Sequence, residues 1–256
     1  MLEIIFEKEI QRLKINRPEV KNAMNSELIE KLTEAVQSVS SNKSIKLLQL
    51  EGSGEVFSAG ADLNYMQSMI GADQKKNLYE AEKLHALFKS IEDCPVPVVC
   101  LVQGAAFGGA LGLMAASDYV VADANAKICF SEVKLGIAPA VISEFVLKKA
   151  VNSQVVPFML SGMIFSAQEA LVAGLVQKIA VNQSLESAAQ SFKESVLTAG
   201  PLAVRSTKKL IQELRVIEPN QIRKLTTHLI AELRVSPEGQ EGLRSFLEKR
   251  KPNWAK

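Results

Sequence analysis

The sequence predicts an α/β protein with a helical C-terminal region. Over the first two-thirds of the chain, short apolar runs typical of strands alternate with segments typical of helices. Glycine-containing loops follow several of these runs, as ligand loops do at strand ends. From Gln183 onward the pattern is helical, with breaks at Gly200-Pro201, Pro219 and Pro237.

The first part of the chain contains a strand pair, a helix and a further strand. Leu2–Phe6 and Ile10–Ile15 are expected to form the strand pair. Asn25 is the expected N-cap of the helix. The apolar face of this helix consists of Leu28, Leu32, Ala35 and Val36. Ile45–Leu50 is a short apolar run that ends at Gly52-Ser53-Gly54, which predicts a buried strand leading into a loop.

The middle of the chain continues the alternation. Leu78–Ile91 is expected to be a helix and Pro95–Val102 the next strand. Further strands are expected at Asp118–Ala122, Lys127–Phe130 and Gln177–Ala180. Ser166 and Glu169 form a capping-box pattern that begins another helix. The helical tail after it is amphipathic, so we expect it to pack on the core or on another subunit.

Composition and charge argue against several classes of function. The 256 residues carry 30 Lys and Arg against 28 Asp and Glu, which gives little attraction for nucleic acid. The N-terminus lacks the features of a signal peptide. Glycines and Gln103 interrupt the apolar stretch 95–114, so no membrane span is expected. Cys94, Cys100 and Cys129 have no paired or metal-ligand spacing, so we expect buried free thiols in a reducing, cytoplasmic setting.

The first candidate site segment is Phe57-Ser58-Ala59-Gly60-Ala61-Asp62-Leu63. Its small residues follow a strand and would let a ligand approach the main chain closely. Asp62 begins a helix pattern, so the amide of Ala61 is expected to lie free near a helix N-terminus. Such an amide suits a developing negative oxygen. A plain tight turn is the alternative interpretation of this segment alone.

The second candidate segment runs from Gly104 to Met114. It follows an apolar strand and opens an apolar helix, whose first amides have no partners within the helix. Gly108 and Gly109 would permit a carbonyl oxygen to lie against the backbone. Close helix packing through small residues is the alternative. Together, the two segments predict one oxyanion hole with a donor from each.

Glu132 is the candidate proton carrier. It follows a short strand and lies in a largely apolar stretch, so burial would raise the pKa of its carboxyl group. A carboxyl group in such a place can move protons to and from carbon. A surface glutamate in a turn is the alternative.

Other titratable residues are weaker candidates. Glu144 follows Ser143 near a helix start, where a solvated or capping role is expected. His85 and His228 are isolated on helices, with no acid at a spacing typical of a triad or a metal site. No nucleophile elbow, P-loop or dinucleotide fingerprint is present, and no metal is expected.

The motifs also occur in a distinctive order and spacing over nearly the whole chain. They are Asn16-Arg17-Pro18, Asn22-Ala23-Met24, the stretch 57–62, Gly104 with Gly108-Gly109, Asp118, Phe130-Ser131-Glu132 with Leu135-Gly136, and the stretch 246–250. This set resembles the enoyl-CoA hydratase/isomerase, or crotonase, superfamily. The resemblance implies a crotonase-type spiral of ββα turns over residues 1–195 and a helical trimerisation region over residues 196–256. It also implies homotrimers or hexamers that act on acyl-CoA, with no cofactor apart from the coenzyme A of the substrate.

The resemblance assigns roles to individual residues. Ala61 and Gly109 match the two oxyanion-hole amides, and Glu132 matches the glutamate that exchanges a proton at the α-carbon. Contacts with the substrate or its CoA are implied for Val20, Lys21, Ala23, Ala59, Asp62, Leu63 and Gly108. Phe246 and Lys249 match residues that reach the CoA of a neighbouring subunit in relatives.

Gly112 departs from the family pattern. Typical hydratases carry a second glutamate there, and the two carboxylates divide the handling of water and of the α-proton. Family members with one glutamate include Δ3-Δ2-enoyl-CoA isomerases. They also include a subgroup similar to segments 108–113 and 135–143, which resembles hydratases of methylglutaconyl-CoA and isohexenylglutaconyl-CoA. We therefore expect hydration of a branched or carboxylated 2-enoyl-CoA by Glu132 alone, with isomerisation as the alternative.

The sequence leaves two further alternatives for the function and predicts one flexible segment. A decarboxylase or dehydratase of acyl-carrier substrates would use the same oxyanion chemistry. A non-catalytic or RNA-binding homologue would use Lys208-Lys209 and Lys249-Arg250-Lys251, although solvated helix faces explain these charges more simply. Residues 64–76 are expected to form a mobile flap over the acyl pocket, because they have mixed polarity and contain Gly71.

Overall fold

The computed structural model describes residues 1–255 and is built on a six-stranded sheet with the order β1-β2-β3-β4-β6-β9. β1 (Leu2–Glu7) pairs antiparallel with β2 (Ile10–Ile15). The next strands, all parallel to their neighbours, are β3 (Leu47–Gly52), β4 (Val98–Val102), β6 (Tyr119–Asp123) and β9 (Lys178–Ala180). Parallel pairing brings the carboxyl ends of these strands to one edge, where ligand loops gather.

A smaller three-stranded sheet lies beside the first. Its strands are β5 (Ala105–Phe107), β7 (Lys127–Cys129) and β8 (Phe165–Ser166), in that order. β5 and β8 were not predicted from the sequence, because two or three residues are too few to show the alternation of apolar and polar side chains that is typical of a strand. β5 leads directly to the glycines that precede α4 (Ala110–Ala116).

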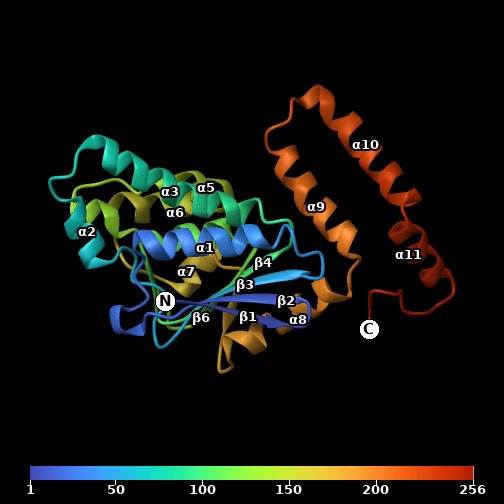
Figure 1. Ribbon diagram of the computed structural model, residues 1–256, viewed down its shortest axis with the longest axis horizontal. Helices are drawn as coiled ribbons and strands as arrows, with labels where there is room; N and C mark the ends of the chain where they lie inside the picture. The colour runs from blue at the N-terminus through green and yellow to red at the C-terminus, as the bar shows by residue number, and fades with distance from the viewer. Residues whose placement is uncertain (256) are drawn as a thin grey trace.

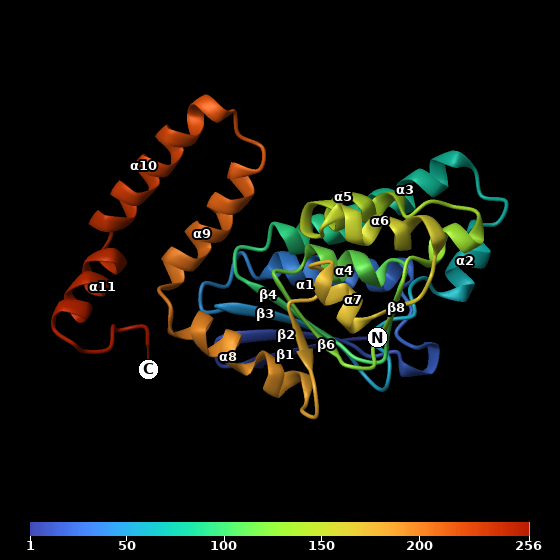
Figure 2. The same ribbon diagram turned by 180° about the vertical axis from the view of Figure 1, so that it is seen from behind.

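Helices cover both faces of the larger sheet (Figures 1 and 2). One face carries α1 (Ser26–Ser38), α3 (Gln74–Glu92), α4, α5 (Ala140–Lys149) and α6 (Asn152–Ser161). The other face carries α8 (Leu185–Thr198). Alternation along each strand supplies both cores: Leu48 and Leu50 of β3 join the first, and Leu47 joins the second.

The remaining core elements are short. They are the turns η1 (Pro18–Val20) and η2 (Ser131–Leu135) and the helices α2 (Leu63–Met69) and α7 (Ala167–Val172). α2 and the start of α3 occupy much of the segment expected to be a flap, because the Asp73 side chain accepts a hydrogen bond from the Lys76 amide and begins α3 before Leu78. The segment is therefore mainly helical, with a short turn at residues 70–73.

The C-terminal arm consists of α9 (Pro201–Leu214), α10 (Pro219–Val235) and α11 (Pro237–Leu247). Each helix has proline in its first turn, where the missing N–H group leaves no hydrogen bond unmade. α9 lies next to the core, whereas α10 and α11 stand away from it (Figures 1 and 2). Phe246 and Leu247 are 81% and 78% exposed, so the arm leaves apolar surface uncovered in a single chain.

Several local predictions are confirmed. The Asn25 side chain accepts a hydrogen bond from the Leu28 amide at the start of α1, and both bonds of the Ser166–Glu169 capping box are present. The three cysteines are free and buried. Some bounds differ: β3 starts and ends two residues later than expected, β4 begins at Val98 rather than Pro95, and β6 lies one residue later. Helix α6 was not expected. Among the described helices, none has the length and apolar content that crossing a bilayer requires.

Candidate active site

The two glycine-containing segments lie side by side. Ser58 and Ala106 form a parallel β-bridge, in which the Ser58 amide donates to the Ala105 carbonyl oxygen at 3.2 Å. The Phe107 amide in turn donates to the Ser58 carbonyl oxygen at 3.1 Å. The structure thus brings together two segments that are some fifty residues apart in the sequence.

Each segment presents a main-chain amide without a protein acceptor. Within residues 1–255, the N–H groups of Ala61 and Gly109 donate to no protein group, whereas those before or after them do. The Asp62 amide donates to the Met24 carbonyl oxygen at 2.9 Å, and the Gly108 amide to the Cys129 carbonyl oxygen at 2.9 Å. Two free amides on adjacent segments can receive one oxygen atom that carries negative charge.

Glycine is required where the two segments touch. Gly60 has φ of +93°, and a Cβ atom there would lie 2.8 Å from the Phe107 carbonyl oxygen. Gly108 also has a positive φ, +52°. A side chain at position 60 would therefore force the segments apart, in addition to the cost of its backbone conformation.

Glu132 lies beside the second segment. It belongs to η2, which follows β7, and its Oε1 atom would lie 3.5 Å from a Cβ atom at Gly108. Its Oε2 atom is buried and has no hydrogen-bond partner within the described residues. Burial raises the pKa of the Glu132 carboxyl group above its ordinary value, as the apolar sequence around it predicted.

A buried ion pair holds the first segment in place. The Arg17 Nη2 atom lies 2.8 Å from Asp62 Oδ2, and Arg17 Nη1 donates to the Ala23 carbonyl oxygen at 2.5 Å. Asp62 also caps α2, since its Oδ1 atom accepts hydrogen bonds from the Asn64 and Tyr65 amides. Burial alone would raise the pKa of Asp62, but the Arg17 guanidinium and the two amides outweigh it and hold this pKa below its ordinary value.

The Arg17–Asp62 ion pair was not predicted from the sequence. Its members are 45 residues apart, and only their membership of the family-like motifs marked them. The carboxylate of Asp62 is engaged with its own protein, and its predicted contact with substrate stays a prediction. Asn22, fully buried, braces the same loop by donating to the Ser53 and Val56 carbonyl oxygens at 2.8 and 2.7 Å.

The other predicted CoA contacts divide into two groups. Val20, Lys21 and Ala23 lie next to the first segment, because the Lys21 carbonyl oxygen accepts a hydrogen bond from the Ala59 amide at 2.9 Å and Met24 pairs with Ala61. Leu63, 81% exposed, begins α2 directly after that segment. Phe246 lies in α11, which stands away from the core (Figure 1), and Lys249 follows this helix, so a single chain does not bring them to the site.

The space beside Gly112 is filled by Phe88 of α3. A Cβ atom at position 112 would lie 2.5 and 2.7 Å from Cε2 and Cε1 of this ring. The ring is fully buried and packs edge-on against Phe145 of α5, with ring centroids 5.7 Å apart. A second carboxylate at position 112 therefore has no room beside the present ring.

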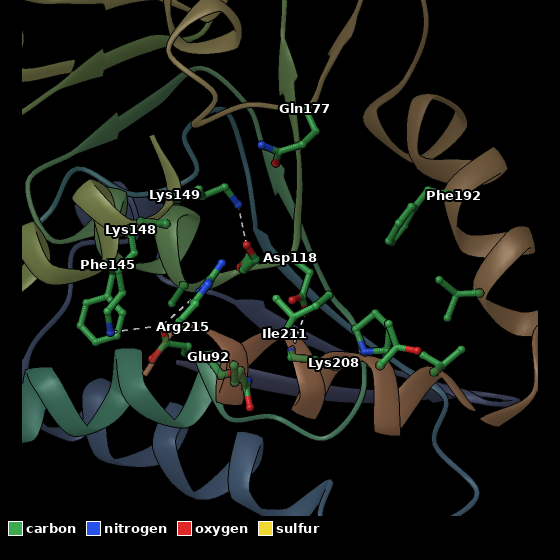
Figure 3. A pocket seen from close by; sticks show the side chains of 18 of the residues that line it. Glu92, Asp118, Phe145, Lys148, Lys149, Gln177, Phe192, Lys208, Ile211 and Arg215 are labelled. Carbon is green, nitrogen blue, oxygen red and sulfur yellow. Dashed lines mark hydrogen bonds and ion pairs between the residues drawn. The ribbon is translucent and has the colours of Figure 1, made fainter. Parts of the chain in front are cut away.

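A cavity of about 740 Å³ lies at the opposite end of α4, between the core and α9 (Figure 3). Ala115 and Ala116 line it, and none of the predicted site residues does. Its buried cations are engaged: Lys208 Nζ contacts Asp118 Oδ2 at 2.5 Å, and Lys149 Nζ donates to the Ser117 carbonyl oxygen at 2.5 Å. Burial lowers the pKa of Lys149 to about 8. The cavity is separate from the site, and the Lys208–Asp118 pair attaches the arm to the core.

The Lys208–Asp118 pair yields a prediction about stability. Lys208→Met should lower the free energy of unfolding by about 2 kcal/mol, because it leaves the Asp118 carboxylate and the Val96 carbonyl oxygen without their cationic partner. Urea denaturation followed by circular dichroism would measure this. Lys209→Met is the matched control, since its side chain is 75% exposed, and it should change stability by less than about 0.5 kcal/mol. Equal effects of the two substitutions would contradict the role given to the pair.

The weaker candidates lie on the surface. His85 Nε2 is 2.9 Å from Glu144 Oε2, and the two side chains are 45% and 44% exposed. Hydrogen bonds from Lys148 and His85 lower the pKa of Glu144 to about 2. His85 therefore has an acid partner that the sequence did not reveal, because 59 residues separate the two. His228 contacts only the Lys224 carbonyl oxygen among described polar groups, and no cluster of three metal-ligating side chains occurs within residues 1–255.

Comparison with known proteins agrees with this fold and arrangement. The family model for enoyl-CoA hydratase/isomerase matches residues 6–256. An enoyl-CoA hydratase from Shewanella pealeana is 36% identical, with a TM-score of 0.94 over 99% of this chain and 95% of that one. Pseudomonas aeruginosa AtuE is 30% identical, with a TM-score of 0.96 over 100% and 99% of the two chains. A crotonyl-CoA hydratase from Syntrophomonas wolfei is 31% identical over 98% of this chain and 97% of that protein. The expected crotonase-type α/β fold is confirmed, and the chain belongs to the enoyl-CoA hydratase/isomerase family.

Proposed function

We propose that this protein hydrates a 2-enoyl-CoA thioester through an enolate intermediate. The observation that carries the proposal is the Glu132 carboxyl group, whose unpartnered Oε2 atom is buried beside the segment that presents the free Gly109 amide. In this proposal the Ala61 and Gly109 amides bind the thioester oxygen and stabilise its charge as the enolate forms. The names of the hydratases similar to this chain support the same reaction.

One carboxyl group serves both proton transfers in this mechanism. Glu132 takes a proton from water while the water oxygen bonds to Cβ, and the electrons of the double bond move toward the thioester oxygen. The protonated carboxyl group then gives a proton to Cα, which leaves a hydroxyl at Cβ and restores the carboxylate. Glu132 performs both steps because Gly112 provides no second acid.

A branched or carboxylated acyl group is the proposed substrate class. Its support is the resemblance of segments 108–113 and 135–143 to hydratases of methylglutaconyl-CoA and isohexenylglutaconyl-CoA. That class would place the protein in the cytoplasmic breakdown of leucine or of acyclic terpenes. The test compares kcat/KM for 3-methylglutaconyl-CoA and crotonyl-CoA, with a higher value expected for the former. A preference for crotonyl-CoA would contradict the substrate class, and binding of both esters without turnover would favour a non-catalytic homologue.

A homotrimer or hexamer is the proposed assembly. The exposed apolar residues of the arm support it, since Val235, Phe246 and Leu247 are each more than three-quarters exposed in a single chain. Such an assembly would also bring Phe246 and Lys249 to a neighbouring site. Sedimentation equilibrium of the purified protein would distinguish a trimer or hexamer from a monomer.

Double-bond isomerisation is a second candidate, favoured by the packing of Phe88 against Gly112. Glu132 would take a proton from Cα of a 3-enoyl-CoA and return it to Cγ, which moves the double bond into conjugation with the thioester. This transfer between carbons needs one carboxylate and no water. Incubation with a 3-enoyl-CoA, followed by absorbance of the conjugated thioester, tests this candidate.

The raised pKa of Glu132 predicts the acid limb of the pH profile. The carboxylate is the form that accepts a proton, so activity should fall as pH drops through the pKa of Glu132. Because burial raises this pKa above the ordinary value of 4.5, the limb of kcat/KM should lie above pH 4.5. Glu144→Gln should leave the acid limb of kcat/KM at the same pH, since Glu144 pairs with Lys148 on the surface. A limb at or below pH 4.5 would contradict the effect of burial.

A further inference from the structure

We infer that Ser131 is a further catalytic residue, whose hydroxyl holds the water molecule that adds to Cβ. The inference rests on the proposed function, because it concerns the water that Glu132 deprotonates in that mechanism. Ser131 directly precedes Glu132 and is the first residue of η2. It belongs to the Phe130-Ser131-Glu132 motif, but the family resemblance assigned it no role.

The smaller sheet brings Ser131 beside the segment of the Gly109 amide. β5 and β7 pair in parallel, and Phe107 with Cys129 is the last pair in register. Gly109 and Ser131 each follow that pair by two residues, so they leave the same edge of the sheet on adjacent stretches of chain. The Gly108 amide donates to the Cys129 carbonyl oxygen at 2.9 Å and joins the two stretches at this point. Parallel pairing therefore delivers both the free amide and the serine to one place.

The Ser131 hydroxyl and the Glu132 carboxyl group border the same space. A Cβ atom on Gly108 would lie 3.3 Å from Ser131 Oγ and 3.5 Å from Glu132 Oε1. Both oxygen atoms are therefore close to one point above the Cα atom of Gly108. Glycine leaves this space open, since a side chain at position 108 would enter it.

The hydroxyl of Ser131 is available for a ligand. Within residues 1–255 its Oγ atom makes no hydrogen bond to a protein group, whereas the hydroxyl of Ser161, for example, donates to a main-chain carbonyl oxygen. Glu132 Oε2 also lacks a partner in this part of the chain. Phe130 is fully buried and stacks on Phe165 with ring centroids 5.8 Å apart, which anchors the start of the turn in the core. Two unpartnered polar groups thus lie next to each other on an anchored turn.

This pair of groups suits a water molecule. A water held away from bulk solvent needs two or more polar partners, and the Glu132 carboxyl group supplies one of them. A serine hydroxyl both donates and accepts, so Ser131 can accept one hydrogen of the water while Glu132 accepts the other. In the addition, the water oxygen bonds to Cβ, one water proton passes to Glu132, and a proton from Glu132 then passes to Cα. Ser131 keeps its own proton throughout and orients the attacking oxygen.

Two reactions of the same site separate the role of Ser131 from that of Glu132. Hydration needs a water at Cβ, whereas exchange of the α-protons of butanoyl-CoA in D2O needs only the two amides and Glu132. Ser131→Ala should lower kcat for hydration by about tenfold, the loss expected for one hydrogen bond to the water. It should leave the rate of α-proton exchange close to that of the wild type. Absorbance follows hydration of the faster of crotonyl-CoA and 3-methylglutaconyl-CoA, and proton NMR follows the exchange.

Two further variants serve as controls. Ser131→Thr keeps a hydroxyl at this position and should retain most of the hydration activity. Ser195→Ala removes a hydroxyl from the exposed face of α8, on the other side of the larger sheet, and should keep the wild-type kcat. Thermal melts of all variants confirm that each is folded.

Three results would overturn the role of Ser131 while wild-type hydration stands. One is unchanged hydration by Ser131→Ala. Another is an equal loss of hydration and exchange, which would show that the hydroxyl supports Glu132 or the enolate rather than the water. The third is a folded Ser131→Thr as slow as Ser131→Ala. If instead the wild type exchanges α-protons but adds no water, the proposed hydration itself fails, and the role of Ser131 fails with it.

Discussion

Glu132→Gln is expected to lower kcat by about 10³-fold or more while acyl-CoA binding persists. Glutamine has the same shape as glutamate but cannot carry the proton, and each positioned proton transfer typically contributes about 10²–10⁴-fold. The effect should be large because the same carboxyl group handles both transfers. Steady-state kinetics with the fastest substrate gives kcat, and calorimetry with a saturated acyl-CoA gives the dissociation constant.

Glu144→Gln is the control for this experiment. Its carboxylate is 44% exposed and pairs with Lys148 and His85, so kcat should stay close to that of the wild type. Near-normal turnover by Glu132→Gln would remove Glu132 from the mechanism. Loss of acyl-CoA binding by the same variant would instead assign Glu132 a role in binding.

Gly60→Ala is expected to lower kcat/KM by about 10²–10³-fold, the loss typical of one oxyanion donor. The new Cβ atom would lie 2.8 Å from the Phe107 carbonyl oxygen, and main-chain atoms on both sides cannot yield as a flexible side chain can. The contact should push the Ala61 amide away from the Gly109 amide. Kinetics and a thermal melt measure activity and folding of the same preparation.

Gly174→Ala separates backbone strain from this contact. Gly174 has φ of +79°, similar to Gly60, but a Cβ atom there would meet its nearest neighbour at 3.6 Å, an ordinary contact. Both variants carry the cost of a positive φ, whereas only Gly60→Ala should lose most of its activity. If the two variants keep equal activity, the close approach at Gly60 does not position the amides.

The sequence predicts the parts of the site that depend on local chemistry. Small residues and glycines after strands marked the segments of Ala61 and Gly109, and the structure shows free amides at both positions. The apolar surroundings of Glu132 predicted the direction of its pKa. These features follow from a few consecutive residues, so pattern and composition suffice to find them.

The parts of the site that the sequence did not predict depend on contacts between residues that are far apart in the chain. The Arg17–Asp62 pair crosses 45 positions, and no local pattern shows that these two charges meet. From the sequence, Phe88 is an ordinary core residue of an amphipathic helix. Only the packing of α3 against α4 shows that its ring fills the space beside Gly112. The family resemblance marked Gly112 as unusual but gave no physical reason for it.

The bridge between Ser58 and Ala106 consists of main-chain hydrogen bonds. The two amide-bearing segments are therefore joined to each other directly through the backbone, with glycine at position 60 permitting the close approach. Mutational drift can replace the residues that surround an acyl chain without moving the groups that polarise its thioester. A scaffold of this kind can acquire new substrates while it keeps the same pair of main-chain hydrogen-bond donors.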